Sequence, residues 1–273
     1  MEKSSETTEK RFAFGRNWQR YLKTVGNREI QAAKRSLEPL LDGIDPSKSS
    51  FLDVGCGSGL FSLAAAQLGF RKVVSFDFDE NSVRATERIR REYHAKSSSW
   101  EVHQGSVLDQ NFMNGLGTFT CVYSWGVLHH TGSMWKALDN TLSVVEAGGH
   151  LYIALYNDQG WISEFWKKVK YAYVNSPPSA RAIMLLFYWL YFGAGLALAD
   201  ILRLRNPLRR YSGDRRGMKF FYDVIDWVGG YPFEVAKPTE VVRRVEEKGF
   251  RLLWSKQVGR RHGCNEFVFE RNF

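Results

Sequence analysis

The stretch Phe51-Leu-Asp-Val-Gly-Cys-Gly-Ser-Gly59 decides the fold, because it joins a short apolar strand to a run of glycines that leads directly into a helix-forming segment. Gly55, Gly57 and Gly59 allow the backbone to turn tightly and to approach a ligand where a side chain would not fit. Such a turn between a strand and a helix is typical of nucleotide-binding α/β folds. The sequence therefore predicts a ligand that contains a nucleotide.

The spacing of the glycines separates two kinds of nucleotide site. A dinucleotide fingerprint, G-x-G-x-x-G, requires glycine where this chain has Leu60, and the spacing is G-x-G-x-G instead. Asp53 lies shortly before the first glycine, where a carboxylate is poorly placed for a pyrophosphate and well placed for an ammonium group. S-adenosylmethionine carries an ammonium group and NAD does not, so the sequence favours S-adenosylmethionine.

Around this turn, apolar runs alternate with amphipathic stretches, which is typical of βαβ units and a parallel sheet. The expected strands are 51–54, 72–77, 100–104, 119–124, 150–155, 251–258 and 265–270. The expected helices are 60–68, 80–93, 133–146 and 238–249. We therefore predict an α/β fold, a doubly wound, seven-stranded Rossmann-like sheet with an aromatic-rich, mostly helical cap inserted after the fifth strand.

Four parts of the chain are expected: an N-terminal helical lid (1–49), the cofactor-binding core (50–156), the cap that binds the acceptor (157–236), and a C-terminal helix with two strands that complete the sheet (237–273). Within the first part, the aromatic stretch 12–21 is either a lid over the cofactor or a helix that packs on the edge of the domain.

Further cofactor contacts are expected at the ends of the next strands. Asp77 ends the second strand, where a carboxylate can accept hydrogen bonds from both ribose hydroxyls of an adenosine. Phe78 can pack on the base, and Ser106 and Val107 follow the third strand, where a loop can reach the adenine edge. Trp125 can face the cofactor, where an aromatic ring stabilises a cation, or it can be a core residue.

These motifs resemble those of the class I S-adenosylmethionine-dependent methyltransferases, with FLDVGCGSG the most specific segment and SFDFD the next. The resemblance covers about 50–155 and the C-terminal strands, and it implies an antiparallel last strand. It also implies that Asp53, Gly55 and Gly57 contact the methionine part of the cofactor and Asp77 the ribose. Cys56 and Gly59 belong to the same predicted loop, whereas Ser106 replaces the acidic residue of many members.

The segment VYSWGVLHHTG is similar to the post-strand loop of methyltransferases that act on small molecules. Because a sulfonium methyl group is already activated, the protein must align donor and acceptor and, where necessary, take a proton. His129 and His130 follow the fourth strand and Tyr156 follows the fifth, so these three are the candidate catalytic residues. A purely structural role for the two histidines remains open.

Within the cap, the run 182–199 contains no charged residue and approaches the length of a membrane span. A single span would separate the last two strands from their sheet, so we favour a helix buried between cap and core, with an interfacial helix as the alternative. Beyond it, the sequence supplies a group of arginines that would face solvent, anionic lipid or an acidic acceptor: Arg203, Arg205, Arg209, Arg210, Arg215 and Arg216. The segment 226–234 is expected at the mouth of the acceptor site.

The composition limits the remaining possibilities. A net charge of +9 favours anionic partners, and the three cysteines lie too far apart for a typical zinc site or disulfide framework, so no metal ligands are predicted. The polar N-terminus has no apolar signal segment, which favours a cytoplasmic protein, with peripheral membrane contact through 182–216 left open. The oligomeric state is not predicted.

We therefore expect methyl transfer from S-adenosylmethionine, by O-methylation, to a small or lipid-like acceptor. The alternatives are RNA methylation, which the basic charge favours although no RNA-binding module is visible, and a non-catalytic protein that only binds S-adenosylmethionine. Nucleic acid is the less favoured partner.

Overall fold

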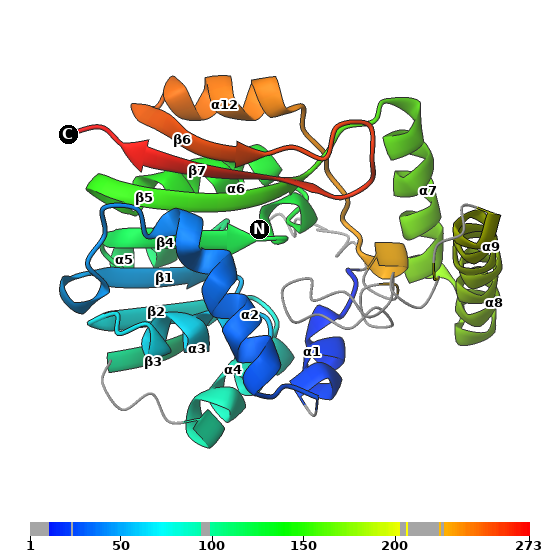
Figure 1. Cartoon of the computed structure of the whole chain (residues 1–273), viewed down its shortest axis with the longest axis horizontal. Coiled ribbons are helices and arrows are strands. Elements are labelled where there is room, and N and C mark those ends of the chain that lie inside the picture. The colour runs from blue at the N-terminus through cyan, green and yellow to red at the C-terminus, as the bar shows by residue number, and fades with distance from the viewer. Residues whose placement is uncertain (1–10, 23, 94–98, 203–205, 207–223, 225–226) are drawn as a thin grey trace, which may run out of the picture.

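The computed structural model describes residues 11–22, 24–93, 99–202, 206, 224 and 227–273. Its centre is a seven-stranded sheet in the order β3-β2-β1-β4-β5-β7-β6, with helices on both faces (Figure 1). All strands from β1 to β5 pair in parallel, whereas β7 pairs antiparallel with β5 and with β6. The predicted fold, including the antiparallel last strand, is confirmed.

Each predicted strand is present. Their bounds are β1 Ser50–Val54, β2 Lys72–Asp77, β3 Ser99–Gln104, β4 Phe119–Trp125, β5 Val145–Tyr156, β6 Phe250–Lys256 and β7 Cys264–Arg271.

The sheet helices also follow the expected order, and the main difference lies between α6 and β5. Their bounds are α2 Asn27–Leu37, α3 Leu60–Gln67, α4 Glu80–Tyr93, α5 Gln110–Gly115, α6 Met134–Ser143 and α12 Pro238–Glu246. A helix to residue 146 was wrong, because Val145 pairs with Phe119 and begins β5. The buried Val145 lies in the core as part of a strand, so the apolar pattern continues across the boundary.

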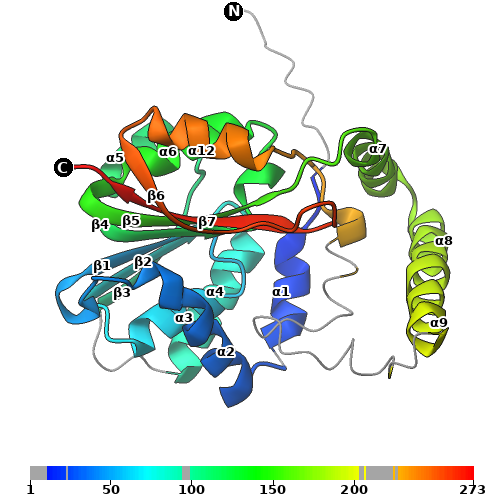
Figure 2. The ribbon, with the colours of Figure 1, turned by 45° about the horizontal axis from the view of Figure 1, so that its top comes forward.

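Alternation along β1 assigns its side chains to the two faces of the sheet. Leu52 and Val54 belong to the core that α5, α6 and α12 cover, whereas Phe51 belongs to the core beneath α2 and α3. The two layers of helices lie on opposite sides of the sheet in Figure 2. Because successive side chains of a strand point to opposite faces, Asp53 faces α3.

A helix ahead of the sheet, α1 (Phe14–Leu22), packs on α4, and Gly15 sets how closely they approach. A Cβ at Gly15 would lie 2.7 Å from the backbone nitrogen of Ser82, so only glycine fits. The helix is also fixed by Asp79 Oδ2, which accepts a hydrogen bond from the Gly15 N–H at 3.0 Å. The predicted N-terminal stretch therefore packs against the domain.

The insert after β5 forms α7 (Trp161–Asn175), α8 (Pro178–Tyr188), a short π-helix η4 (Trp189–Ala194) and α9 (Gly195–Leu202). The α8–α9 part extends away from the sheet in Figures 1 and 2. It leaves large apolar side chains in solvent, with exposed fractions between 43% and 76%: Ile183, Leu186, Phe187, Trp189, Leu190, Leu198, Ile201 and Leu202.

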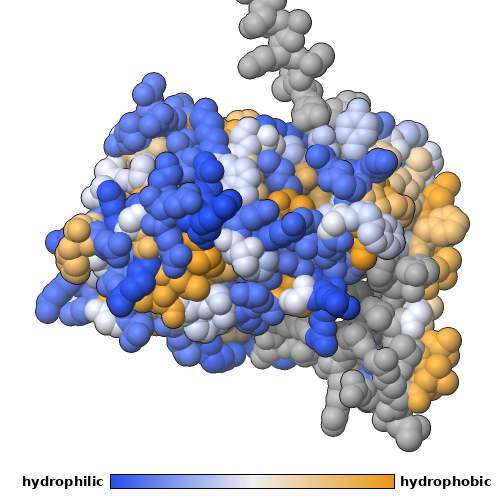
Figure 3. Space-filling model, turned by 90° about the horizontal axis from the view of Figure 1, so that it is seen from above, coloured by the Kyte–Doolittle hydropathy of each residue, from blue (hydrophilic) through white to orange (hydrophobic). Residues whose placement is uncertain are grey.

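A helix buried between cap and core was therefore the wrong expectation for 182–199. The side chains of Met184, Leu185 and Tyr188 pack against a small cluster with Tyr173 and Tyr231. In the described part of the chain, no helix is sufficiently long and apolar to cross a membrane. In Figure 3, hydrophobic residues cover the end of the molecule that carries α8 and α9, and separate hydrophobic areas appear elsewhere on this face. The arginines predicted between 203 and 216 lie outside the described residues.

Candidate active site

The glycine loop between β1 and α3 has the backbone that its sequence predicts. Gly55, Gly57 and Gly59 all have positive φ, at 75°, 55° and 75°. A Cβ at Gly55 would lie 2.3 Å from Val127, and one at Gly59 would lie 2.8 Å from Thr86. The loop is anchored to the next strand, because the N–H groups of Gly55 and Cys56 both donate to the carbonyl of Phe76. A side chain at Gly55 or Gly59 would therefore collide with Val127 or Thr86 and strain the backbone.

Asp53 is buried beneath α3 and belongs to a chain of polar side chains. Its Oδ2 accepts a hydrogen bond from Ser62 Oγ at 2.5 Å, Ser62 in turn accepts from Ser75, and Ser75 accepts from Trp100 Nε1. Burial raises the pKa of Asp53 from 3.8 to about 7, against the hydrogen bond from Ser62, and nearby Asp77 raises it further. A cationic group beside Asp53 would favour the charged carboxylate, which suits the ammonium group predicted there.

Asp77 connects the glycine loop with the end of β2. Its Oδ2 accepts from the Gly57 N–H at 3.0 Å and its Oδ1 from the Asp79 N–H at 2.9 Å. Burial raises the pKa of Asp77 to about 6, and the hydrogen bonds from Asp79 and Gly57 oppose the rise. Both predicted carboxyl groups are thus buried next to the glycine loop, and Asp77 bonds to it directly.

The other predicted cofactor residues differ in their surroundings. Phe78 is exposed at the end of β2, and Ser106 Oγ caps its own turn by accepting from the Leu108 N–H. Val107 lies in the core, Cys56 accepts a hydrogen bond from Thr86 Oγ1, and Trp125 packs against the core beneath α2 and α3. Contacts of these five residues with the cofactor therefore stay predictions, and the side chains of Val107 and Cys56 are engaged inside the protein.

Helix α1 covers the glycine loop, which the aromatic composition of 12–21 only partly predicted. A Cβ at Gly57 would lie 3.0 Å from Trp18 Nε1, so the indole lies directly on the loop. On the other side, the Arg11 guanidinium lies 5.5 Å from the centre of the Phe78 ring and donates to the Thr131 carbonyl at 3.1 Å. The segment Arg11 to Trp18 therefore crosses from the end of β2 to the loop after β4.

His129 lies in that loop after β4 and is completely buried. Its Nδ1 accepts a hydrogen bond from the Tyr156 backbone N–H at 3.3 Å, and its ring packs 3.9 Å from the Tyr156 ring. Burial lowers the pKa of His129 well below 6.5, and the neighbouring His130 and Lys170 lower it further. The neutral ring then carries its proton on Nε2, which has no hydrogen-bond partner among the described residues. The Nε2–H of His129 is therefore a buried N–H donor.

In His130 the proton lies on the other ring nitrogen, Nδ1. Its Nδ1 lies 2.7 Å from the carbonyl oxygen of Pro232, and because a carbonyl can only accept, Nδ1 carries the proton. Burial lowers the pKa of His130 to about 3, although the hydrogen bond to Pro232 opposes this. The ring is therefore neutral and its Nε2 is an acceptor. The centres of the two imidazole rings are 4.5 Å apart.

A buried lysine beside the histidines was not predicted. Lys170 of α7 donates to the Trp227 carbonyl, and its Nζ lies 4.4 Å from the Trp227 ring, 4.8 Å from Phe233 and 5.9 Å from Tyr156. The spacing of Trp166, Lys170 and Tyr173 places all three on one face of a helix, which is the signal that could have identified it. The lysine and these rings form an aromatic cluster. It joins the cap to the loop after β4 (126–133), which carries His129 and His130 and is called the histidine loop below.

The predicted acceptor segment reaches the same place. Of 226–234, residues 227–234 are described, and the Glu234 N–H donates to the His129 carbonyl at 3.0 Å. Both carboxylate oxygens of Glu234 accept from the Met134 N–H and so cap α6. The same segment supplies the Pro232 carbonyl that bonds to His130. Hydrogen bonds from Pro232 and Glu234 thus hold this segment against the histidine loop and α6.

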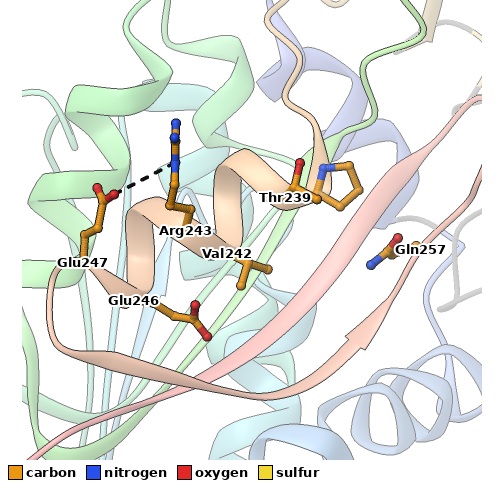
Figure 4. Close-up of a pocket in the computed structure, with 7 residues that line it drawn as sticks. Thr239, Val242, Arg243, Glu246, Glu247 and Gln257 are labelled. Atoms are coloured by element: carbon orange, nitrogen blue, oxygen red, sulfur yellow. Dashed lines mark ion pairs between the residues drawn. The ribbon is translucent and has the colours of Figure 1, made fainter.

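Other features lie away from this site. The pocket in Figure 4, of about 380 Å³, lies between α12 and Gln257, and none of the predicted site residues lines it. Within the described residues, no group of His, Cys, Asp and Glu is arranged to hold a metal ion. The predicted site residues therefore lie at the glycine loop and the histidine loop and not at this pocket.

Comparison with known families agrees with this geometry. A methyltransferase domain model matches residues 21–201, which is more than half of the chain. The chain belongs to the methyltransferase domain family. Its glycine cradle and two buried carboxylates fit S-adenosylmethionine, whose sulfonium and ammonium groups are cationic. The predicted family and cofactor are thereby confirmed.

Curated relatives match only parts of the chain. Ribosomal protein L11 methyltransferase of Alteromonas mediterranea is 45% identical over 51 residues, or 19% of this chain and 18% of that protein. Ubiquinone biosynthesis O-methyltransferase of Caulobacter vibrioides is 27% identical over 109 residues, or 40% of this chain and 41% of that protein. The chain thus spans less than half the length of either relative.

Among solved structures, the fold is similar to magnesium protoporphyrin IX methyltransferase from Synechocystis PCC 6803 with bound SAH. The TM-score is 0.55 at 14% identity, with 94% of each chain covered. At this identity the likeness shows the fold.

Proposed function

We propose that the protein transfers the methyl group of S-adenosylmethionine to a hydroxyl oxygen of an amphipathic, lipid-like acceptor. When bound at the glycine loop, S-adenosylmethionine supplies a methyl group that is already activated on a sulfonium. The chain supplies the remaining requirements, which are alignment of the acceptor, exclusion of water and a place for the acceptor's proton.

We propose oxygen as the methylated atom because His129 and His130 have opposite tautomers. A hydroxyl group both donates and accepts, so it can donate to His130 Nε2 while it accepts from His129 Nε2–H. A carboxylate has no proton to donate to His130, and an ammonium group has no lone pair for His129. The pair of neighbouring rings is therefore complementary to a neutral hydroxyl group.

In this arrangement His130 accepts the hydroxyl proton as the new C–O bond forms and the C–S bond to the methyl group breaks, and His129 orients the oxygen. Tyr156 holds His129 through its backbone N–H and its ring, so we assign it a positioning role. The buried positive charge of Lys170 is among the causes of the lowered pKa of both histidines, which keeps the two rings neutral before the reaction.

The exposed side of α8 and α9 supports a lipid-like acceptor at a membrane surface. Monomeric proteins seldom expose contiguous apolar patches of large side chains without an interaction to explain them. The occupant proposed here is a lipid bilayer, because the patch is uncharged from Ala182 to Ala199 and the chain carries a net charge of +9. The protein is then a cytoplasmic enzyme that binds the membrane peripherally.

The proposal can be tested by incubating the purified protein with methyl-labelled S-adenosylmethionine and a cell extract separated into lipid, polar-metabolite, protein and RNA fractions. Label in the lipid fraction, stable to mild alkali as expected of a methyl ether, supports the proposal. Label in the RNA fraction would favour the RNA alternative. Tight cofactor binding without label in any fraction would favour a non-catalytic binding protein, and either result overturns the proposed reaction.

A further inference from the structure

A second cavity, of about 240 Å³, lies between α1 and the insert, and arginines surround it. Arg11, Arg16 and Arg20 come from the N-terminal segment, and Arg181 comes from the first turns of α8. We refer to this cavity as the arginine groove. None of its lining residues is acidic, and its remaining walls are largely apolar, with Phe12, Ala13, Tyr173 and Val174.

We infer that the arginine groove binds the phosphate or diphosphate group of the amphipathic acceptor. This inference rests on the proposed function, since it assigns the acidic end of the molecule whose hydroxyl group is methylated. Several guanidinium groups suit a group with more than one negative charge, because each presents planar N–H donors that match phosphate oxygens. The apolar walls suit the adjoining hydrocarbon.

The charges in the groove lack counter-ions among the described residues. Arg16 and Arg20 are one turn apart on α1 and exposed, and neither makes an ion pair with the part of the chain that the structure describes. Like charges at this spacing repel each other and destabilise a helix slightly. A bound phosphate group removes this repulsion.

Two of the arginines are held in place by the backbone. Arg181 donates through Nε to the Tyr173 carbonyl at 3.0 Å and through Nη2 to the Val174 carbonyl at 2.8 Å. It therefore caps the end of α7 and still has unused N–H donors, since a guanidinium has five. Arg11 is fixed to the Thr131 carbonyl. Part of the groove is thus ordered before any ligand binds.

The groove lies close to the histidine loop. Phe14 follows the groove residue Ala13, and its ring lies 4.8 Å from the His130 ring. Phe12, which lines the groove, packs 6.4 Å from Tyr173 on the insert. A molecule anchored by its phosphate at the arginines has an apolar path along these rings toward His130.

The test is direct binding of inorganic pyrophosphate and of a long-chain alkyl phosphate, measured by calorimetry on the full chain. The variant is Arg16→Gln with Arg20→Gln. The matched control is Arg35→Gln with Arg260→Gln, which removes the same charge from exposed positions outside the groove. Affinity for both probes should fall at least tenfold in the groove variant and stay within twofold in the control, with S-adenosylmethionine binding unchanged in both.

Vesicles distinguish an acceptor phosphate from the headgroups of a bilayer. If the groove variant loses binding to vesicles that contain phosphatidylglycerol but keeps its affinity for pyrophosphate, the groove contacts the membrane and the inference is overturned. Equal losses in the groove variant and the control would show only general electrostatic attraction, which also overturns it. Because neither probe is methylated in the assay, the result is independent of whether the proposed reaction occurs.

Discussion

His130 Nδ1 donates a hydrogen bond to the carbonyl oxygen of Pro232 at 2.7 Å, which ties the loop after β4 to the segment that leaves the cap. This bond fixes the tautomer of His130, and so its Nε2 becomes the acceptor in the site. The cap therefore takes part in the chemistry because it decides which nitrogen of the imidazole is available.

Replacing His130 with Asn keeps an N–H near the Pro232 carbonyl and removes the Nε2 acceptor. We expect kcat to fall by about 10²- to 10⁴-fold, since this is the usual contribution of a positioned general base. Because the pKa of His130 is lowered to about 3, the ring is neutral above pH 5, and its protonation should produce no acid limb there. His103→Asn, at an exposed histidine of β3, is the control. Turnover by His130→Asn equal to that of the wild type would contradict the assignment.

Replacing His129 with Phe preserves a ring beside Tyr156 and removes the Nε2–H donor. The acceptor oxygen then loses one hydrogen bond, so we expect kcat/KM for the acceptor to fall about 10- to 100-fold while the dissociation constant of S-adenosylmethionine stays unchanged. Steady-state kinetics with varied acceptor and calorimetry with the cofactor measure the two effects. Activity equal to the wild type would show that His129 only fills space.

Binding of S-adenosylmethionine should release a proton from Asp53. Its pKa is raised to about 7 in the cofactor-free protein, and an ammonium group nearby favours the charged carboxylate. Calorimetry at pH 6.5 in two buffers of different ionisation enthalpy should therefore show proton release. The release should be absent in Asp53→Asn, and this variant should also bind the cofactor about 10- to 100-fold more weakly. The control Asp42→Asn, at an exposed turn, should release the proton as the wild type does.

The same raised pKa predicts an effect on stability. The folded-state pKa of Asp53 lies above its ordinary value of 3.8, so the stability that proton binding contributes is present at low pH and lost as the pH rises through 7. Asp53→Asn should raise the free energy of unfolding of the cofactor-free protein by roughly 1 to 3 kcal/mol at pH 8, with a smaller gain at pH 5. Urea unfolding at the two pH values measures this, and a loss of stability at pH 8 would refute the account of the buried carboxylate.

Trp18 should slow the exchange of the cofactor, because its indole lies on Gly57. Trp18→Ala uncovers the glycine loop, and we expect S-adenosylmethionine to dissociate at least tenfold faster in stopped-flow displacement experiments. Trp161→Ala is the matched control, since Trp161 is 78% exposed on α7. Equal dissociation rates in the three proteins would show that α1 packs on the domain without acting as a lid.

The apolar side of α8 should determine membrane binding. Leu186→Glu with Phe187→Glu places charge on the exposed side, and both residues are more than half exposed, so folding should be unaffected. Sedimentation with vesicles that contain phosphatidylglycerol should show at least a tenfold loss of binding. Gln31→Glu with Gln67→Glu adds the same charge at exposed positions of α2 and α3, away from this helix, as a control. Loss of self-association instead, seen by analytical ultracentrifugation, would identify a second copy of the chain as the occupant.

The sheet could be predicted because each of its elements leaves a local pattern. Glycines at fixed spacing give the turn after β1, and Asp53 and Asp77 could be identified as candidate ligand residues from their positions at strand ends. The tautomers of His129 and His130 could not be predicted, because they depend on the backbone groups of Tyr156 and Pro232, and Pro232 lies about a hundred residues away. Lys170 shares a helix face with Trp166 and Tyr173, which the sequence does show, but its contact with Trp227, which lies 57 residues away, could not be predicted.

For the run 182–199, the sequence predicts a helix but not whether that helix is buried. A membrane span would separate the last two strands from their sheet, and this argument led to the prediction of a helix buried between cap and core. Burial depends on whether another element lies over the helix, which composition does not reveal. Here Leu185 packs on the insert while Leu186 and Phe187 remain in solvent.

The central claim is that the methyl group goes to a hydroxyl oxygen of an amphipathic molecule. The most direct measurement is the carbon NMR spectrum of the product formed from S-adenosylmethionine carrying a ¹³C-labelled methyl group and the lipid fraction of a cell extract. The account predicts a labelled carbon bonded to oxygen as a methyl ether, formed by the wild-type protein and strongly reduced with His130→Asn. A labelled carbon bonded to nitrogen, sulfur or carbon, or an O-methyl product formed equally well by His130→Asn, would contradict it.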